Sequence, residues 1–186
     1  MSAQLRKYKF TVAQYMRMGE VGILTEDERV ELLEGEIFKM PPVSSHHAGC
    51  VGWFTHTITI LLHRSVIVRT RNPVHLDDYS EPVPDVALVK RRDDFYKHGH
   101  PRPEDVLLLI EVSDSTLEYD RRVKVPIYAR AGVAEVWIVN LVDERVETFA
   151  GTSRGAYQKV TTFSRGEEVR SRSLAALRLG VSEILG

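Results

Sequence analysis

The sequence predicts an α/β (α+β) fold in which strands buried on both faces pack against helices. The runs PDVALVK, from Pro84, and DVLLLIEVS, from Asp105, are apolar without alternation, which is typical of strands covered on both faces. A long segment that begins at Ser44 or Ser45 has apolar residues three or four positions apart, which is typical of a core helix of about seventeen residues. We therefore expect core strands with helices packed against them.

Length and composition indicate a globular protein of one domain, residues 1–186. Hydrophobic residues make up 43% and charged residues 27%, and no Pro, Gly or Ser tract marks a linker. The single cysteine, Cys50, excludes an intrachain disulfide bond and a multi-cysteine metal site, and it fits a reducing compartment. There is no signal-peptide core and no apolar run of ~18 residues. We therefore expect a soluble, cytoplasmic protein that does not cross a membrane.

Two helices and a strand are expected in the first forty residues. Thr11 is placed to cap a short helix. Thr25 heads TEDERVELLEGEIFKM, whose capping-box pattern predicts a second helix that ends at Gly35, with EIFKM as the first strand. Glu31 and Glu34 would share one face of that helix, where spacing alone favours two solvated glutamates.

The rest of the chain predicts further strands and one more helix. VIVRT and NPVHL are expected to be strand pieces, and RRDDFYKHGHPRPED a polar loop of about fifteen residues. Asp120 to Ala131 has a helical pattern with Gly132 at the usual stop, although Pro126 interrupts it. EVWIVN, RVETFA and AYQKVTTF read as strands, the first two paired as a hairpin. The tail is expected to form a short strand and a helical turn, with SLAAL as its helical signal.

Two carboxylates stand at the borders of the buried strands. Asp85 opens the first apolar run and Glu111 closes the second. A carboxylate there is costly to desolvate without a cation or hydrogen-bond partners, so the pair suggests a shared divalent ion. Mg²⁺ takes one or two carboxylates together with other oxygens, and the Val112 carbonyl could supply one. Lys124 would add the positive charge that phosphodiester hydrolysis needs. On spacing alone, a structural ion pair or a helix cap is the more common explanation.

No competing chemistry is better supported by the sequence. The motifs GxSxG, GxxxxGK[ST], GxGxxG after a strand, and HExxH are all absent. Ser113 and Ser115 beside Asp114 suggest acyl transfer only weakly, because neither a nucleophile turn nor a histidine partner accompanies them. These absences exclude the common hydrolase, nucleotide-binding and zinc signatures.

Several segments closely resemble the Uma-two family of restriction-endonuclease-like proteins. They cover nearly the whole chain: ERVELLEGEIFKM, the SSHH helix start, EPVPDVAL, DVLLLIEVSDSTLEYDRRVKVPIYARAGVAEVWIVN and RVETF. The family is assigned to the PD-(D/E)XK nuclease superfamily. The resemblance therefore implies a restriction endonuclease-like fold, with a mixed central β-sheet flanked by helices, and a magnesium-dependent site.

The resemblance also implies roles for individual residues. Asp85 matches the PD aspartate and Glu111 matches the second acid of the motif. Ser113 stands where the motif has lysine, and Lys124 matches the place on the following helix to which the family's lysine has moved. The positive charge is kept, but the resemblance does not define the exact role of the displaced lysine.

Five more residues are considered on the same resemblance, two pairs of them as alternatives. The helix-borne glutamate that many such nucleases add would be Glu31, with Glu34 as the alternative. His46 is expected beside the site, and Asp120 or Tyr128 is expected to position the lysine.

The resulting hypothesis is a DNA endonuclease that uses Mg²⁺ or Mn²⁺ at Asp85 and Glu111, with Lys124 assisting the attacking water and Glu31 supporting the metal shell. A homodimer is expected, because two sites related by a two-fold axis suit the cutting of two strands. The alternative is a catalytically inactive nucleic-acid-binding or assembly module on the same fold. A third hypothesis is a hydrolase of a small phosphorylated substrate.

Overall fold

A six-stranded mixed sheet is the centre of the computed structural model, which describes residues 6–25 and 27–186. The strand order is β3-β4-β5-β6-β7-β8, and only β5 and β6 run parallel. The bounds are Val66–Thr70 (β3), Val86–Lys90 (β4), Val106–Ser113 (β5), Glu135–Asn140 (β6), Arg145–Ser153 (β7) and Ala156–Ser164 (β8). The two runs without alternation form β4 and β5, as predicted, and the mixed α+β class is confirmed.

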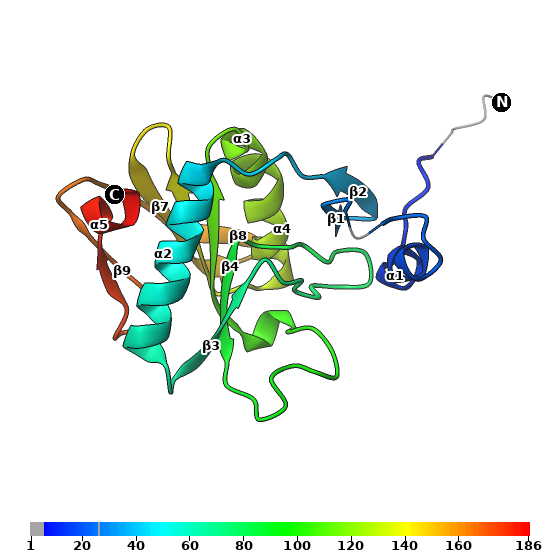
Figure 1. Cartoon of the computed structure of the whole chain (residues 1–186), viewed down its shortest axis with the longest axis horizontal. Coiled ribbons are helices and arrows are strands. Elements are labelled where there is room, and N and C mark those ends of the chain that lie inside the picture. The colour runs from blue at the N-terminus through cyan, green and yellow to red at the C-terminus, as the bar shows by residue number, and fades with distance from the viewer. Residues whose placement is uncertain (1–5, 26) are drawn as a thin grey trace.

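Helices cover both faces of this sheet (Figure 1). On one face lie α2 (Ser45–Leu62) and α5 (Val181–Leu185); on the other lie α3 (Leu117–Tyr119), a π-helical turn η2 (Asp120–Lys124) and α4 (Val125–Ala131). Side chains alternate between the two cores: Leu108 and Ile110 pack with α2, whereas Leu109 packs with α4. Glu111 follows the same alternation and faces α4. No helix within residues 6–25 and 27–186 is long and apolar enough to cross a bilayer.

The first predicted helix and the start of the core helix are confirmed. The helix α1 spans Val12–Glu20, and Thr11 caps it in a reciprocal capping box with Gln14. The Ser44 side chain accepts a hydrogen bond from the His47 backbone N–H at the start of α2. In both helices the capping residue predicted from the sequence is the residue at which the helix starts.

The helix predicted to end at Gly35 is wrong. This segment forms the antiparallel hairpin of β1 (Val30–Leu33) and β2 (Glu36–Lys39). Glu34 and Gly35, the two turn residues, have φ angles of 48° and 79°, as a tight two-residue hairpin turn requires. A left-handed pair cannot continue a helix, so Glu31 is carried by a strand and not by a helix.

The predicted helix at Asp120 is present but starts earlier and contains a wide turn. It begins with α3 at Leu117, and the Val125 N–H bonds to the Asp120 carbonyl across the π-helical turn. Pro126, which has no N–H to donate, follows this turn directly in the first turn of α4. Gly132 ends the helix with a φ of 84°, as predicted.

Two smaller predictions are wrong. NPVHL is an irregular segment in which Val74 and Leu76 are buried, because its backbone bonds to Pro82 and Ser80 across a turn instead of joining the sheet. SLAAL is a turn between β9 (Glu168–Arg170) and β10 (Arg178–Gly180) and not a helix. The other expected strands and the polar loop after Lys90, which ends in the short 3₁₀ helix η1 (Pro103–Asp105), are confirmed.

Glu135, at the start of β6, anchors the backbone that leads into SLAAL. Its buried carboxylate accepts hydrogen bonds from Trp137 Nε1, Ser171 Oγ and the backbone N–H groups of Arg172 and Ser173. These bonds fix the backbone that enters SLAAL. The tail then places Leu177, Leu179 and the apolar residues of α5 in the core beside Trp137.

Candidate active site

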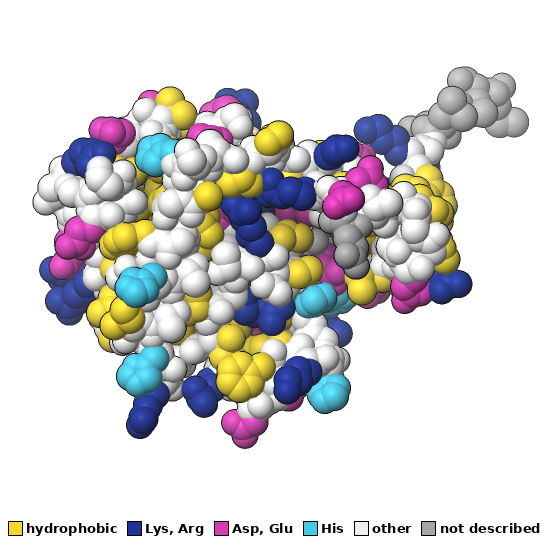
Figure 2. Space-filling model, viewed as in Figure 1, with side chains coloured by type: hydrophobic (Ala, Val, Ile, Leu, Met, Phe, Trp, Pro, Cys, Tyr) yellow, Lys and Arg dark blue, Asp and Glu magenta, His cyan; other side chains and the backbone are white. Residues whose placement is uncertain are grey.

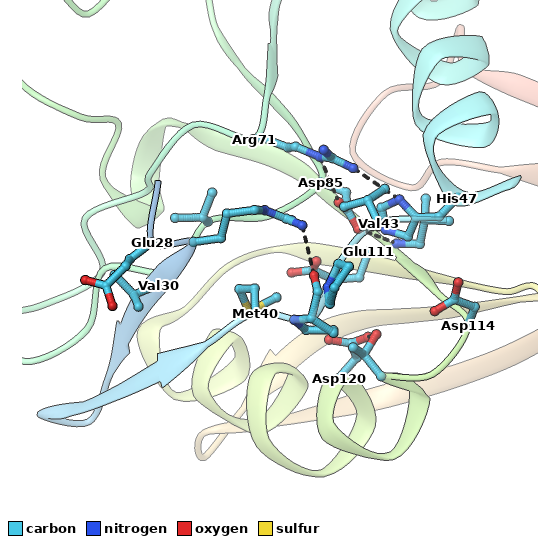
Figure 3. A pocket seen from close by; sticks show the side chains of 16 residues that line it. Glu28, Val30, Met40, Val43, His47, Arg71, Asp85, Glu111, Asp114 and Asp120 are labelled. Atoms are coloured by element: carbon cyan, nitrogen blue, oxygen red, sulfur yellow. Dashed lines mark hydrogen bonds and ion pairs between the residues drawn. The ribbon is translucent and has the colours of Figure 1, made fainter. Parts of the chain in front are cut away.

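Two adjacent strands bring Asp85 and Glu111 together. Val86 of β4 pairs with Ile110 of β5, so the residue before β4 lies beside Glu111. Both side chains line a pocket of about 210 Å³. Figure 3 shows the two carboxylates with His47, Arg71 and Asp120 around this pocket. The structure thus places the two acids at one site, as the spacing suggested.

Asp85 is held from three sides. Its Oδ2 atom lies 3.0 Å from His47 Nε2 and accepts a hydrogen bond of 3.0 Å from the Val112 N–H. Its Oδ1 atom lies 3.6 Å from Arg71 Nε. Burial alone would raise the pKa of Asp85, but the hydrogen bonds from His47 and Val112 outweigh it and lower the pKa below its ordinary value. Asp85 is therefore ionised at neutral pH.

Lys124 forms the buried centre of the ion pairs behind the pocket. Its Nζ atom lies 2.8 Å from Glu111 Oε1 and 3.4 Å from Glu31 Oε2, and all three side chains are nearly inaccessible to solvent. Burial would lower the pKa of Lys124, but the two carboxylates raise it well above its ordinary value. The lysine is charged, and it is not among the residues that line the pocket.

Glu31 joins this group from β1. Its Oε2 atom accepts a hydrogen bond of 3.0 Å from the Val83 N–H, and its Oε1 atom accepts one of 3.1 Å from Tyr119 Oη. Glu34, the alternative, is exposed and pairs with Arg130 at 2.7 Å. The structure brings Glu31 to the site and leaves Glu34 at the surface.

Glu111 is the acid whose ionisation is most disfavoured. Its Oε1 atom accepts a hydrogen bond of 2.6 Å from Tyr128 Oη in addition to the Lys124 contact. Burial raises the pKa of Glu111 to about 8; Lys124 opposes this, while the negative charges of Asp120, Asp85 and Glu31 add to it. A further cation bound in the pocket would stabilise the ionised form of the Glu111 carboxyl group.

We predict that this carboxyl makes the metal-free protein less stable as pH rises. The pKa of Glu111 is raised from 4.5 to about 8 in the folded state, so its contribution to stability is complete below pH 4.5 and is lost as pH rises through 8. Urea unfolding in EDTA at several pH values measures this. Glu111→Gln, which cannot ionise, should remove this part of the pH dependence; an unchanged profile in the variant would contradict the assignment.

Two hydroxyl groups donate hydrogen bonds to the buried Asp120 carboxylate in place of water. Its Oδ2 atom accepts hydrogen bonds of 2.7 Å from Ser113 Oγ and 2.7 Å from Thr116 Oγ1. Ser113, at the position of the motif's lysine, therefore holds an acid of the π-helical turn. Burial raises the pKa of Asp120, against the effect of Lys124 and these hydroxyl groups. The turn thus presents Asp120 to the pocket and Lys124 to the carboxylates behind it.

Comparisons with known proteins identify the family and support the fold. The family model of Uma2, described as "Putative restriction endonuclease", matches residues 12–182. This chain belongs to the Uma2 family. A crystal structure described as that of a putative nuclease belonging to DUF820 from Anabaena variabilis is similar, with a TM-score of 0.73 and 14% sequence identity over 95% of this chain and 97% of that one. A search of the curated proteins finds no match.

His47 and Arg71 line the pocket of this Uma2 chain, although neither was assigned to the site from the sequence. His46, which was expected beside the site, is exposed in the hollow between α2 and α5, and its neighbour His47 contacts Asp85 instead. The buried face of α2 includes His47 together with Phe54 and Ile58. Helical spacing could therefore have identified His47 as the inward-facing histidine. Arg71 belongs to the basic segment RTR, residues 69–71, and nothing in the sequence indicates that its side chain points into the protein.

The charges around the Uma2 pocket fit a hard divalent cation. The pocket lining includes five acids and two arginines: Glu28, Asp85, Glu111, Asp114 and Asp120, with Arg29 and Arg71. Glu31 and Lys124 add one charge of each sign behind the pocket. In the described part of the chain no three acidic, histidine or cysteine side chains are arranged as a complete metal cage. Mg²⁺ does not require one, because it is usually held by one or two carboxylates plus water and phosphate oxygens. Two carboxylates at one pocket, with surplus negative charge, meet this need.

Proposed function

We propose that this Uma2 chain is a divalent-metal-dependent DNA endonuclease that hydrolyses phosphodiester bonds. The observation that carries the proposal is the position of Asp85 and Glu111 on adjacent strands at one pocket, in a group of acids with too few cations to neutralise it. The Uma2 description and the nuclease name of the similar structure support the same reaction class.

Each residue has a distinct task in this proposal. Asp85 and Glu111 would hold Mg²⁺ or Mn²⁺, with the Val112 carbonyl as a further oxygen. The ion, when bound, polarises the phosphoryl oxygen and makes water a stronger nucleophile. The Val112 N–H fixes the orientation of the Asp85 carboxylate.

Lys124 and Glu31 act from behind the pocket. The ammonium group of Lys124 keeps Glu111 oriented and lowers the cost of its ionisation, and Tyr128 fixes the same oxygen atom. Glu31 holds Lys124 in turn, at 3.4 Å. Direct contact between Lys124 and the attacking water stays a prediction.

The test is cleavage of supercoiled plasmid and of single-stranded DNA by the purified protein. We expect nicking or linearisation that needs Mg²⁺ or Mn²⁺ and stops with EDTA. Calorimetry with Mn²⁺ should show binding that weakens in Asp85→Asn and in Glu111→Gln, because each loses an anionic ligand. Equal metal affinity in the wild type and both variants would contradict the site.

The alternative, a catalytically inactive nucleic-acid-binding module, is favoured by one observation. Lys124, the residue expected at the attacking water, is only 1% exposed and lies behind Glu111. DNA binding that is salt-sensitive, independent of Mg²⁺ and without cleavage would support this module and exclude the nuclease.

A further inference from the structure

Arg71 stands at the mouth of the acidic pocket, in a backbone conformation that few side chains adopt. It follows β3 directly, and its φ of 51° lies in the left-handed region. Its N–H donates to the Asp85 carbonyl at 3.1 Å, which ties this turn to the strand that carries the site. The conformation turns the Arg71 side chain toward Asp85 and His47 (Figure 3).

The contacts of Arg71 fix the hydrogen position on His47. Arg71 Nη2 lies 3.2 Å from His47 Nδ1, and a guanidinium group can only donate. Nδ1 therefore accepts, so Nε2 carries the hydrogen and donates to Asp85 Oδ2. His47 is thus a neutral bridge between the arginine and the aspartate.

The guanidinium group of Arg71 is only partly satisfied by these contacts. Its Nε atom is buried, makes no hydrogen bond with the described residues, and lies 3.6 Å from Asp85 Oδ1, beyond hydrogen-bond distance. Buried donors without a partner are rare and costly, so the Nε atom leaves part of the hydrogen-bonding capacity of the guanidinium group unused. About a third of the side chain is exposed, on the side of the pocket.

A second arginine lines the same pocket. Arg29 is exposed, lines the pocket and donates a hydrogen bond of 2.9 Å to the Pro41 carbonyl. Figure 2 shows Lys and Arg side chains in the middle of this face, between the sheet and the part that carries β1 and β2. Two arginines therefore line the pocket together with its carboxylates, an arrangement suited to a cation held by the acids and a phosphate group held by a guanidinium group.

We propose that Arg71 binds a backbone phosphate of the nucleic acid at the mouth of this pocket and that His47 holds the guanidinium group in position. The inference rests on the proposed function, since it names the residue that receives the substrate. A free phosphate monoester presents the same oxygens, so the experiment includes both ligands. His47 acts through Arg71 and Asp85 and is a positioning residue.

The experiment measures DNA affinity by fluorescence anisotropy in EDTA, over a range of salt concentrations, so that no turnover occurs. Arg71→Ala should weaken duplex binding about tenfold and reduce the slope of log affinity against log salt concentration by ~0.9, the contribution of one phosphate contact. Arg71→Lys, which keeps the charge, should restore most of the slope. Arg178→Ala, which removes an equal charge on the exposed surface of β10, should leave the slope unchanged.

His47 provides a second, independent variant pair. Gln can accept from Arg71 and donate to Asp85, as the neutral histidine does, whereas Leu can do neither. We expect His47→Gln to keep a salt slope near that of the wild type and His47→Leu to approach Arg71→Ala. Equal slopes in all these proteins would overturn the inference.

The outcomes separate this inference from the proposed function. If DNA binds with the expected loss in Arg71→Ala but is not cleaved in Mg²⁺, the phosphate contact of Arg71 is supported and only the nuclease activity is excluded. If the wild type cleaves DNA but Arg71→Ala has an unchanged salt dependence of DNA affinity, only the phosphate contact of Arg71 is contradicted. Binding of a phosphate monoester without binding of DNA, measured by calorimetry, overturns the assignment to a nucleic-acid backbone.

Discussion

Asp85→Asn is expected to reduce metal-dependent DNA cleavage about a thousandfold. A bound divalent ion stabilises the transition state by several kcal/mol, and each 1.4 kcal/mol corresponds to about a factor of ten in rate. Asparagine keeps the volume of Asp85 and can still accept the Val112 N–H, but it loses the negative charge. The rate should therefore fall far more than the stability. Initial rates on supercoiled plasmid with saturating Mg²⁺ measure the effect.

A matched control makes this result specific. Asp143→Asn removes the same charge from an exposed aspartate at the turn between β6 and β7. The Asp143→Asn protein should cleave DNA at the wild-type rate. Circular dichroism and urea unfolding check that both variants are folded. If Asp85→Asn kept more than about a tenth of the wild-type rate, Asp85 would not be a metal ligand.

Lys124→Met is expected to cause the largest loss of stability, about 3–5 kcal/mol at alkaline pH. Removing one partner of a buried ion pair leaves the other charge without compensation, and here Glu111 and Glu31 both lose their cation. The loss should be smaller at acidic pH, because a protonated Glu111 needs no cation. The sign follows from the raised pKa of Glu111: its contribution to stability is present at low pH and lost as pH rises.

Urea unfolding at about pH 5.5 and about pH 9 tests this expectation, with EDTA present. Lys159→Met removes a lysine from the exposed surface of β8 and should change the free energy of unfolding by less than about 0.5 kcal/mol. Equal losses for Lys124→Met at both pH values would show that the lysine contributes packing and not charge compensation.

The parts of the fold that the sequence predicted are those decided by local patterns. The runs that became β4 and β5 are apolar on both faces because helices cover both sides of the sheet. Thr11 and Ser44 located two helix starts because a capping side chain bonds only to its nearest backbone neighbours. Asp85 and Glu111 could be paired because one loop joins their strands.

The parts that could not be predicted depend on distant contacts. ELLEGE is compatible with a helix, and only the left-handed pair Glu34–Gly35, whose Gly35 N–H bonds to the Tyr79 carbonyl, decides for a hairpin. Arg71 enters the pocket through its contacts with His47 and Asp85, which no short segment reveals.

The carboxylate of Glu135 has a consequence for the order in which the protein folds during synthesis. It lies at the start of the central strand β6, but three of its four donor residues are Ser171, Arg172 and Ser173, and Leu177, Leu179 and the apolar residues of α5 join the core of Trp137 from still later in the chain. A ribosome-bound chain that lacks these residues would bury the Glu135 carboxylate with only the Trp137 indole left of these four donors, at high cost. The native packing around β6 can therefore form only after residues 171–185 have left the ribosome, and not while the nascent chain ends at β8.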